Sequence, residues 1–186
     1  FLIVQSKKVI FLNGIQSGED LTLVLREFRT LYTSEVVNRV AAHGIDASYD
    51  YFNESKSIPL PATFTKMLGN QVGNFGFGES AKLYSAYPFP WREKEHSLDA
   101  FQSDALSALN KSPNRPFFRI ETLGGVETFR YATADIMRSG CVSCHNSHSA
   151  SPKRDWQVGD VRGVLEVNFP ITGLAENTDE YLNRYI

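Results

Sequence analysis

The segment Cys141-Val142-Ser143-Cys144-His145 constrains the chain more than any other feature of its sequence. It contains both cysteines of the protein, three positions apart, and a histidine directly follows the second. Two thiols at this spacing can each form a thioether with one vinyl group of a haem, and the adjacent imidazole then ligates the iron. The motif therefore predicts one covalent c-type haem, attached through Cys141 and Cys144 and held by His145 as its proximal axial ligand.

Two other chemistries use cysteines at this spacing, and we consider both weaker. A structural zinc site needs four ligands, and His148 would complete such a set at an unusually tight spacing. A thioredoxin-like pair opens a helix after a strand in a βαβ pattern, which this sequence does not show. A pair of thiols without function is the remaining alternative. Haem attachment is the interpretation we favour.

Length and charge are those of one globular domain. The chain has 186 residues, of which 42% are apolar and 22% charged, enough to bury a core and too apolar for disorder. A net charge of -2 provides no basic field for nucleic acid. No apolar run reaches the roughly 18 residues of a membrane span. No pair of nucleophile and base and no phosphate loop is present, so we expect no enzymatic activity.

The apolar periodicity predicts a long N-terminal helix. Apolar side chains recur at helical spacing over residues 17–43. A capping-box pattern beginning at Ser17 predicts the start of this helix, and Gly44 predicts its end. A continuation of the helix back through Lys7 to Ile15 is the alternative, although Gly14 and Gly18 weaken that stretch.

The remaining elements predict an α+β fold in a single domain over residues 1–186. Helical spacing returns over residues 62–72 and 97–109, and a loose strand is expected over residues 83–87. Two strands at 116–123 and 126–136 flank a Gly-Gly hairpin signal, and a third strand is predicted at 161–169. Polar loops are expected over residues 45–61 and 138–159.

Three cations that follow the motif are candidate partners of the haem propionates. Buried carboxylates need compensating charge, which Lys153, Arg154 and Arg162 would supply. The alternative for any one of them is a charge that merely solvates the loop.

Five segments around the motif are similar to a known family. They are Ile58-Pro59-Leu60-Pro61-Ala62-Thr63-Phe64, Leu83-Tyr84-Ser85-Ala86-Tyr87-Pro88-Phe89-Pro90-Trp91-Arg92, residues 130–137, Asn146-Ser147-His148 and residues 151–163. Together they resemble the DUF3365 family of c-type haem domains, over most of residues 20–170.

The resemblance implies a PAS-like fold, in which a long N-terminal helix packs beside an antiparallel sheet that holds the haem. Similar domains often lie between two transmembrane helices, ahead of a cyclase, kinase or chemotaxis output. Phe1 to Val4 would then be the end of the first span, and the chain after Ile171 would lead to the second. Because covalent c-type haem is matured outside the bacterial cytoplasm, we expect the domain on the periplasmic side of a bacterial inner membrane.

The distal ligand of the iron is left open. Some family members use a cysteine of the first long helix, but here the motif takes both cysteines, and alignment on Pro59 and Pro61 puts Tyr32 near that position. His148 lies three residues after His145 in the same loop, so the opposite face of the haem is awkward for it to reach. His43 is at a helix end, where a cation suits the dipole and a solvated side chain is the alternative role. His96 lies in a charged run and is expected to be exposed. Core packing is the alternative role for two further candidates, Met67 and Met137.

Two functions follow as expectations. The first is a sensor, in which redox state or a diatomic gas such as nitric oxide or carbon monoxide changes the iron ligation and moves the helix at residues 17–43. That helix would also contact a second copy in a homodimer. The second is a plain electron carrier with a redox partner. A carrier normally has a shorter chain and a lysine rim, and we therefore favour the sensor.

Overall fold

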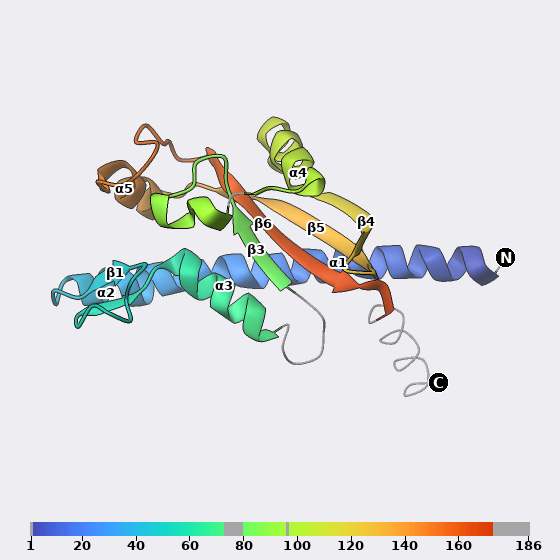
Figure 1. Ribbon diagram of the computed structural model, residues 1–186, viewed down its shortest axis with the longest axis horizontal. Coiled ribbons are helices and arrows are strands. Elements are labelled where there is room, and N and C mark those ends of the chain that lie inside the picture. Colours follow the sequence, from blue (N-terminus) through green and yellow to red (C-terminus); the bar gives the residue numbers. More distant parts are fainter. Residues whose placement is uncertain (1, 73–79, 96, 173–186) are drawn as a thin grey trace.

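The computed structural model describes residues 2–72, 80–95 and 97–172. Its centre is a four-stranded antiparallel sheet in the order β3-β6-β5-β4, formed by Ser80–Tyr84, Val161–Pro170, Val126–Ile136 and Phe117–Leu123. A long helix, α1 (Leu2–Leu31), crosses one face of this sheet, and α4 (Ala100–Lys111) covers the other (Figure 1). The predicted α+β class, with a long N-terminal helix and an antiparallel sheet, is confirmed.

The alternation of side chains along β5 explains the two layers. Phe129 and Tyr131 point to the α1 face, where they form a buried cluster with Leu25 of the helix. Ala132 and Ala134 belong to the opposite cluster, which contains the apolar face of α4. Each face of the sheet therefore has its own helix and its own apolar core.

The start of α1 corrects the sequence prediction. The helix begins at Leu2 and passes through Ser17 without a break, so Ser17 is not an N-cap. Gly14 and Gly18 lie where α1 crosses the sheet. A Cβ at Gly14 would lie 2.8 Å from Cγ of Phe129, and one at Gly18 would overlap the ring of Tyr131. The two glycines thus serve close packing of helix on sheet, for which their low helix propensity is the cost.

The C-terminal part of the helix agrees with the prediction. After α1 the chain continues through a wide π-helical turn, Tyr32–Val37, into α2 (Asn38–Ala41). Gly44 then adopts a positive φ of 73°, which ends the helical run as predicted.

Most shorter elements fall near their predicted positions. α3 spans Pro61–Val72, and α4 begins after Asp99, whose side chain forms a reciprocal capping box with Gln102. Gly124 and Gly125 have φ of 57° and 87° in the β4–β5 hairpin. β3 ends at Tyr84, three residues before the predicted end, and a 3₁₀ helix at Pro90–Glu95 follows it.

Both predicted polar loops contain regular structure. Within residues 45–61, β1 (Asp46–Ser48) and β2 (Ser57–Pro59) pair in parallel as a second, two-stranded sheet. Within residues 138–159, α5 spans Ser139–Ser147. Three-residue strands and a helix rich in Ser, Gly and Cys carry little apolar periodicity, which is why the sequence did not reveal them.

A buried ion pair holds the centre of the sheet. Arg130 of β5 is 1% exposed, and its Nη2 lies 2.8 Å from Oε1 of Glu166 on β6, whose side chain is fully buried. The same guanidinium pairs with Glu121 of β4 at 3.0 Å and lies 4.0 Å above the ring of Phe101 on α4. This one side chain therefore connects three strands and the helix that covers them.

We expect Gly18→Ala to destabilise the protein, because the added methyl group overlaps the Tyr131 ring and must push α1 away from the sheet. Overpacking of this kind typically costs about 1–3 kcal/mol, measured as the free energy of unfolding in urea. Gly140→Ala is the matched control, since the nearest atom to a Cβ there is Cγ2 of Thr33 at 4.0 Å. Equal stability of the two variants would contradict the close packing.

Candidate functional site

Helix α5 carries the whole cysteine motif. Residues three positions apart lie on one face of a helix, so Cys141 and Cys144 face the same side of α5. Both thiols are free, with Cys141 partly buried and Cys144 exposed. Two reduced thiols on one helix face are the arrangement that attachment to a single haem requires.

His145 is the most strongly perturbed group of the site. Burial, and then the positive charge of Arg162, lower the pKa of its imidazole to about 4. The ring is therefore neutral at pH 7, which is the form that binds a metal. Nε of Arg162 donates to Nδ1 of His145 at 3.3 Å, so a metal would bind through Nε2.

A group of charges links His145 to the long helix. Arg29 of α1 donates to the carboxylate of Asp135 near the end of β5. Asp135 raises the pKa of His145, whereas Arg29 lowers it, so both charges lie within electrostatic reach of the imidazole. The carboxylate also acts on Arg162, the hydrogen-bond donor to His145. No local pattern indicates the Arg29–Asp135 pair, because its partners are 106 positions apart in the chain.

A second contact brings α5 itself to α1. Nη2 of Arg138, directly before the helix, lies 3.7 Å from Oε1 of Glu27. Arg29 and Glu27 thus both connect α1 to the segment that carries the motif. Arg29 reaches the end of β5 and Glu27 reaches the residue before α5, so the two contacts bring different sides of α1 near the segment around the motif.

Three stacked rings, those of Phe89, Trp91 and Tyr49, form an aromatic wall next to the motif. The ring of Phe89 lies 5.3 Å from that of His145 and is stacked on Trp91 at 4.6 Å. Trp91 in turn lies 5.6 Å from His148 and is stacked on Tyr49 at 4.4 Å. Flat apolar surfaces of this kind suit a porphyrin. In the sequence, only the family resemblance singles out residues 83–92, and their alternation of proline and aromatic residues is the local signal for these rings.

The three cations predicted to pair with propionates have protein partners. Nζ of Lys153 lies 2.6 Å from Oδ1 of Asp155 and 4.8 Å from the centre of the Trp156 ring. Arg154 donates to the carbonyl of Ser149. Arg162 is the only one of the three that contacts His145. The role of all three towards propionates stays a prediction.

Two distal candidates lie in packed surroundings. The hydroxyl of Tyr32 donates to the carbonyl of Pro59 at 2.9 Å, and its ring lies 4.8 Å from that of Phe64. Met137 is 1% exposed, and its backbone pairs with residues 159 and 160. Both side chains contribute to the core in this structure.

The other candidates lie nearer the surface. Met67 is 43% exposed, and its Sδ accepts from the Tyr51 hydroxyl at 3.5 Å. His148 accepts the amide of Ala150 at Nδ1, at 3.1 Å. His43 is exposed beyond the end of α2, and His96 lies outside the described residues. The distal ligand stays a prediction among these residues.

The two alternative cysteine chemistries find no support in the geometry. Within residues 2–72, 80–95 and 97–172, no three His, Cys, Asp or Glu side chains gather as a group that could hold a metal ion. A reactive redox cysteine has a lowered pKa. Although Cys144 is exposed as a residue, desolvation of its thiol and the nearby Cys141 raise its pKa.

Asn146 fastens the end of α5 to the loop that follows it. Its Nδ2 donates to the carbonyl of Trp156 at 2.9 Å, and its Oδ1 accepts the amide of the same residue at 3.0 Å. The amide side chain thus satisfies both backbone groups of Trp156, as a residue in a neighbouring strand would. It holds Trp156, which is buried, beside the motif.

Comparison with known proteins finds one family. A family described as Tll0287-like matches residues 21–170, which include every element from the middle of α1 to the end of β6. No curated protein and no solved structure matches the chain. Of the helices in the described part of the chain, none combines the length and the apolar character needed to cross a membrane.

We expect Asn146→Asp to release the loop after α5, because a carboxylate accepts the Trp156 amide but cannot donate to its carbonyl. Backbone amides of residues 149–158 should then exchange with deuterium about tenfold faster or more, equivalent to a loss of about 1.4 kcal/mol in local stability. Ser147→Ala, at the exposed neighbouring position, should leave these rates unchanged. Unchanged exchange in Asn146→Asp would show that other contacts hold the loop.

Proposed function

The chain belongs to the Tll0287-like family, also known as DUF3365, and we propose that it is a c-type haem sensor domain. The observation that carries the proposal is the set of donors on α5: two free thiols on one helix face, directly followed by a neutral imidazole. Cys141 and Cys144 would hold the haem, and His145 would be its axial ligand. When bound, the haem supplies an iron centre that changes oxidation state and binds diatomic gases.

The surroundings of α5 fit the group. Phe89 and Trp91 offer stacked aromatic surface beside His145, and burial keeps that histidine neutral. Arg162 holds the imidazole by its Nδ1, so the protein orients the ring before a metal binds. The PAS-like character of the fold, the membrane tether and an output module outside this chain belong to the same proposal.

Location follows from the chemistry of attachment. Covalent c-type haem is matured outside the bacterial cytoplasm, so we propose that the domain lies on the periplasmic side of the inner membrane. Both cysteines of the chain would be consumed by the haem, which leaves no thiol to oxidise in that compartment.

The contacts of α1 favour a sensor over a plain electron carrier. A sensor needs an element that both the iron site and the output can bias, and α1 meets the site through Arg29 and Asp135. Electron transfer alone does not require an element that changes position with the state of the iron. Large apolar side chains on α1 are also exposed, and they would serve the proposed contact with a second copy: Leu12, Leu23, Val24 and Leu31.

Haem attachment is tested by expression in a host that matures c-type cytochromes. Haem should stay with the chain through extraction with acidified organic solvent, because a thioether bond survives unfolding. Cys141→Ala and Cys144→Ala should each reduce the retained haem severalfold, and Ser143→Ala between them should not. Release of all haem from the unaltered protein into the solvent phase would overturn the proposal.

The sensor role is tested with spin labels at Asn38 on α2 and Glu127 on β5, both exposed positions. The distance between them should differ between ferric, ferrous and carbon-monoxide-bound forms. Asp135→Asn should reduce that difference at least twofold, because it removes the charge that Arg29 contacts. Glu35→Gln, which breaks only the exposed pair with Arg39, is the control. Identical distances in all three forms would leave the helix a passive scaffold and favour the electron carrier.

A further inference from the structure

A β-bulge brings Arg162 to the cysteine motif. The register of the β5–β6 ladder shifts between Asp135 and Ile136, and Arg162 is the additional residue on β6 at that point. A bulge turns the side chain of its additional residue out of the regular alternation of the strand. From this position Nε of Arg162 reaches Nδ1 of His145 at 3.3 Å.

The guanidinium of Arg162 is held from several sides. Its Nη1 donates to Oγ of Ser85, and the Ser85 hydroxyl donates to the carbonyl of Arg162 at 2.6 Å. The rings of Phe89 and Trp156 have their centres 5.8 Å and 5.3 Å from the central carbon of the guanidinium. Arg162 is thus fixed at the Nδ1 side of the proposed axial ligand.

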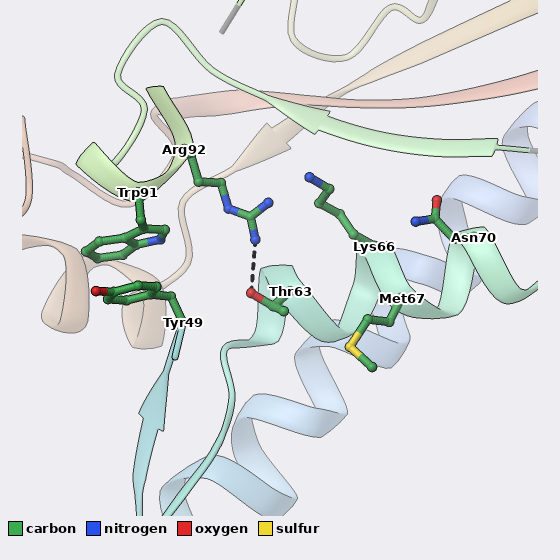
Figure 2. Close-up of a pocket in the computed structure, with 7 residues that line it drawn as sticks. All are labelled: Tyr49, Thr63, Lys66, Met67, Asn70, Trp91 and Arg92. Atoms are coloured by element: carbon green, nitrogen blue, oxygen red, sulfur yellow. Dashed lines mark hydrogen bonds between the residues drawn. The ribbon is translucent and has the colours of Figure 1, made fainter. Parts of the chain in front are cut away.

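A second arginine near the aromatic wall is directed elsewhere. Nη2 of Arg92 donates to Oγ1 of Thr63 at 2.9 Å, in a cavity that is also lined by the stacked rings of Tyr49 and Trp91 (Figure 2). Its side chain extends from the wall towards α3. Of these two arginines, Arg162 is the one that the structure places in contact with the motif.

The hydrogen bond from Arg162 determines which nitrogen of His145 carries the ring proton. A neutral imidazole has one N–H group and one acceptor nitrogen. Because Nδ1 accepts from Arg162, the proton is on Nε2, which is also the nitrogen left for a metal. A metal bond to Nε2 uses the lone pair of that atom, so the proton has to leave it. The other nitrogen of a histidine ligand then carries the proton and donates it to a carboxylate, a carbonyl or water.

A protonated Nδ1 cannot keep Arg162 as its partner, because two donors would face each other. Asp135 offers an acceptor beside this pair. It lies opposite Gly163 in the ladder, directly next to Arg162, and its charge acts to raise the pKa of both Arg162 and His145. Its Oδ1 accepts from Arg29 of α1. A carboxylate has about four lone-pair sites, so it can accept from a second donor as well.

We propose that Asp135 is a positioning residue of the proposed haem site, and that its carboxylate replaces Arg162 as the partner of Nδ1 of His145 when Nε2 binds iron. The ring stays neutral in this exchange, since Nε2 gives its proton to water and Nδ1 takes one from water. The inference rests on the proposed function and deepens it. The carboxylate that orients the axial ligand would also be the one that Arg29 of α1 contacts.

The test uses the haem-loaded full chain, isotope-labelled at the histidine nitrogens and reduced under carbon monoxide, with acid-resistant haem measured first. Nuclear magnetic resonance should show a proton on Nδ1 of His145 that exchanges slowly with water. Asp135→Asn should make this exchange about tenfold faster or more, because a hydrogen bond to a charged acceptor is lost. Asp135→Glu should restore slow exchange, which separates loss of the acceptor from a folding defect. Glu27→Gln, which removes another carboxylate between α1 and the segment before α5, is the matched control and should leave the exchange unchanged.

The outcomes separate the two proposals. Acid-extractable haem in the unaltered protein overturns haem attachment and this inference with it. Covalent haem with no proton on Nδ1 overturns this inference alone, because Arg162 would then have kept its hydrogen bond to the ring. A slowly exchanging Nδ1 proton that Asp135→Asn leaves unchanged also overturns it, since a carbonyl or water would then be the acceptor.

Discussion

The close approach of α1 to the sheet determines where the rest of the molecule can lie. At Gly14 and Gly18 the helix backbone rests directly on the rings of Phe129 and Tyr131, so neither sliding nor rotation of the helix is free. The same strand, β5, continues to Asp135, and the same helix continues to Arg29. Their ion pair is therefore a consequence of the crossing, and it positions the helix against the segment that carries the motif.

The face of the sheet covered by α4 also contains a buried ion pair. Arg130 and Glu166 are removed from water together, and loss of Arg130 would leave the buried carboxylate of Glu166 without its cation. Asp99 adds a third carboxylate to the guanidinium while it caps α4, so the start of that helix is tied to the sheet by the same group. The α1 face thus combines its apolar core with close packing at two glycines, and the α4 face combines its apolar core with a buried ion pair.

Sequence reasoning succeeded where a local pattern carries the information. The hairpin at Gly124 and the end of the long helix at Gly44 each have a signature within a few residues, and the structure confirms both. The haem role of the cysteine motif stays a prediction. It failed at Gly18 because helix propensity includes only the local cost of glycine. The reason for glycine there is the ring of Tyr131, which belongs to a strand more than a hundred positions away. The helix around the motif was missed for a related reason. Asn146 fixes this helix to the following loop through two hydrogen bonds with Trp156. The helix itself has no apolar periodicity that would predict it.

The wide turn at Tyr32–Val37 has a geometric consequence for the long helix. There the amide of Asn38 donates to the carbonyl of Thr33, five positions back, so the turn contains one residue more than a regular α-helical turn. That additional residue shifts the phase of α2 relative to α1 by about 100°. The side chains of α2 therefore lie on a different side of the helical rod from the one that the periodicity of α1 would give them. A stripe of side chains that follows α1 does not continue straight along α2.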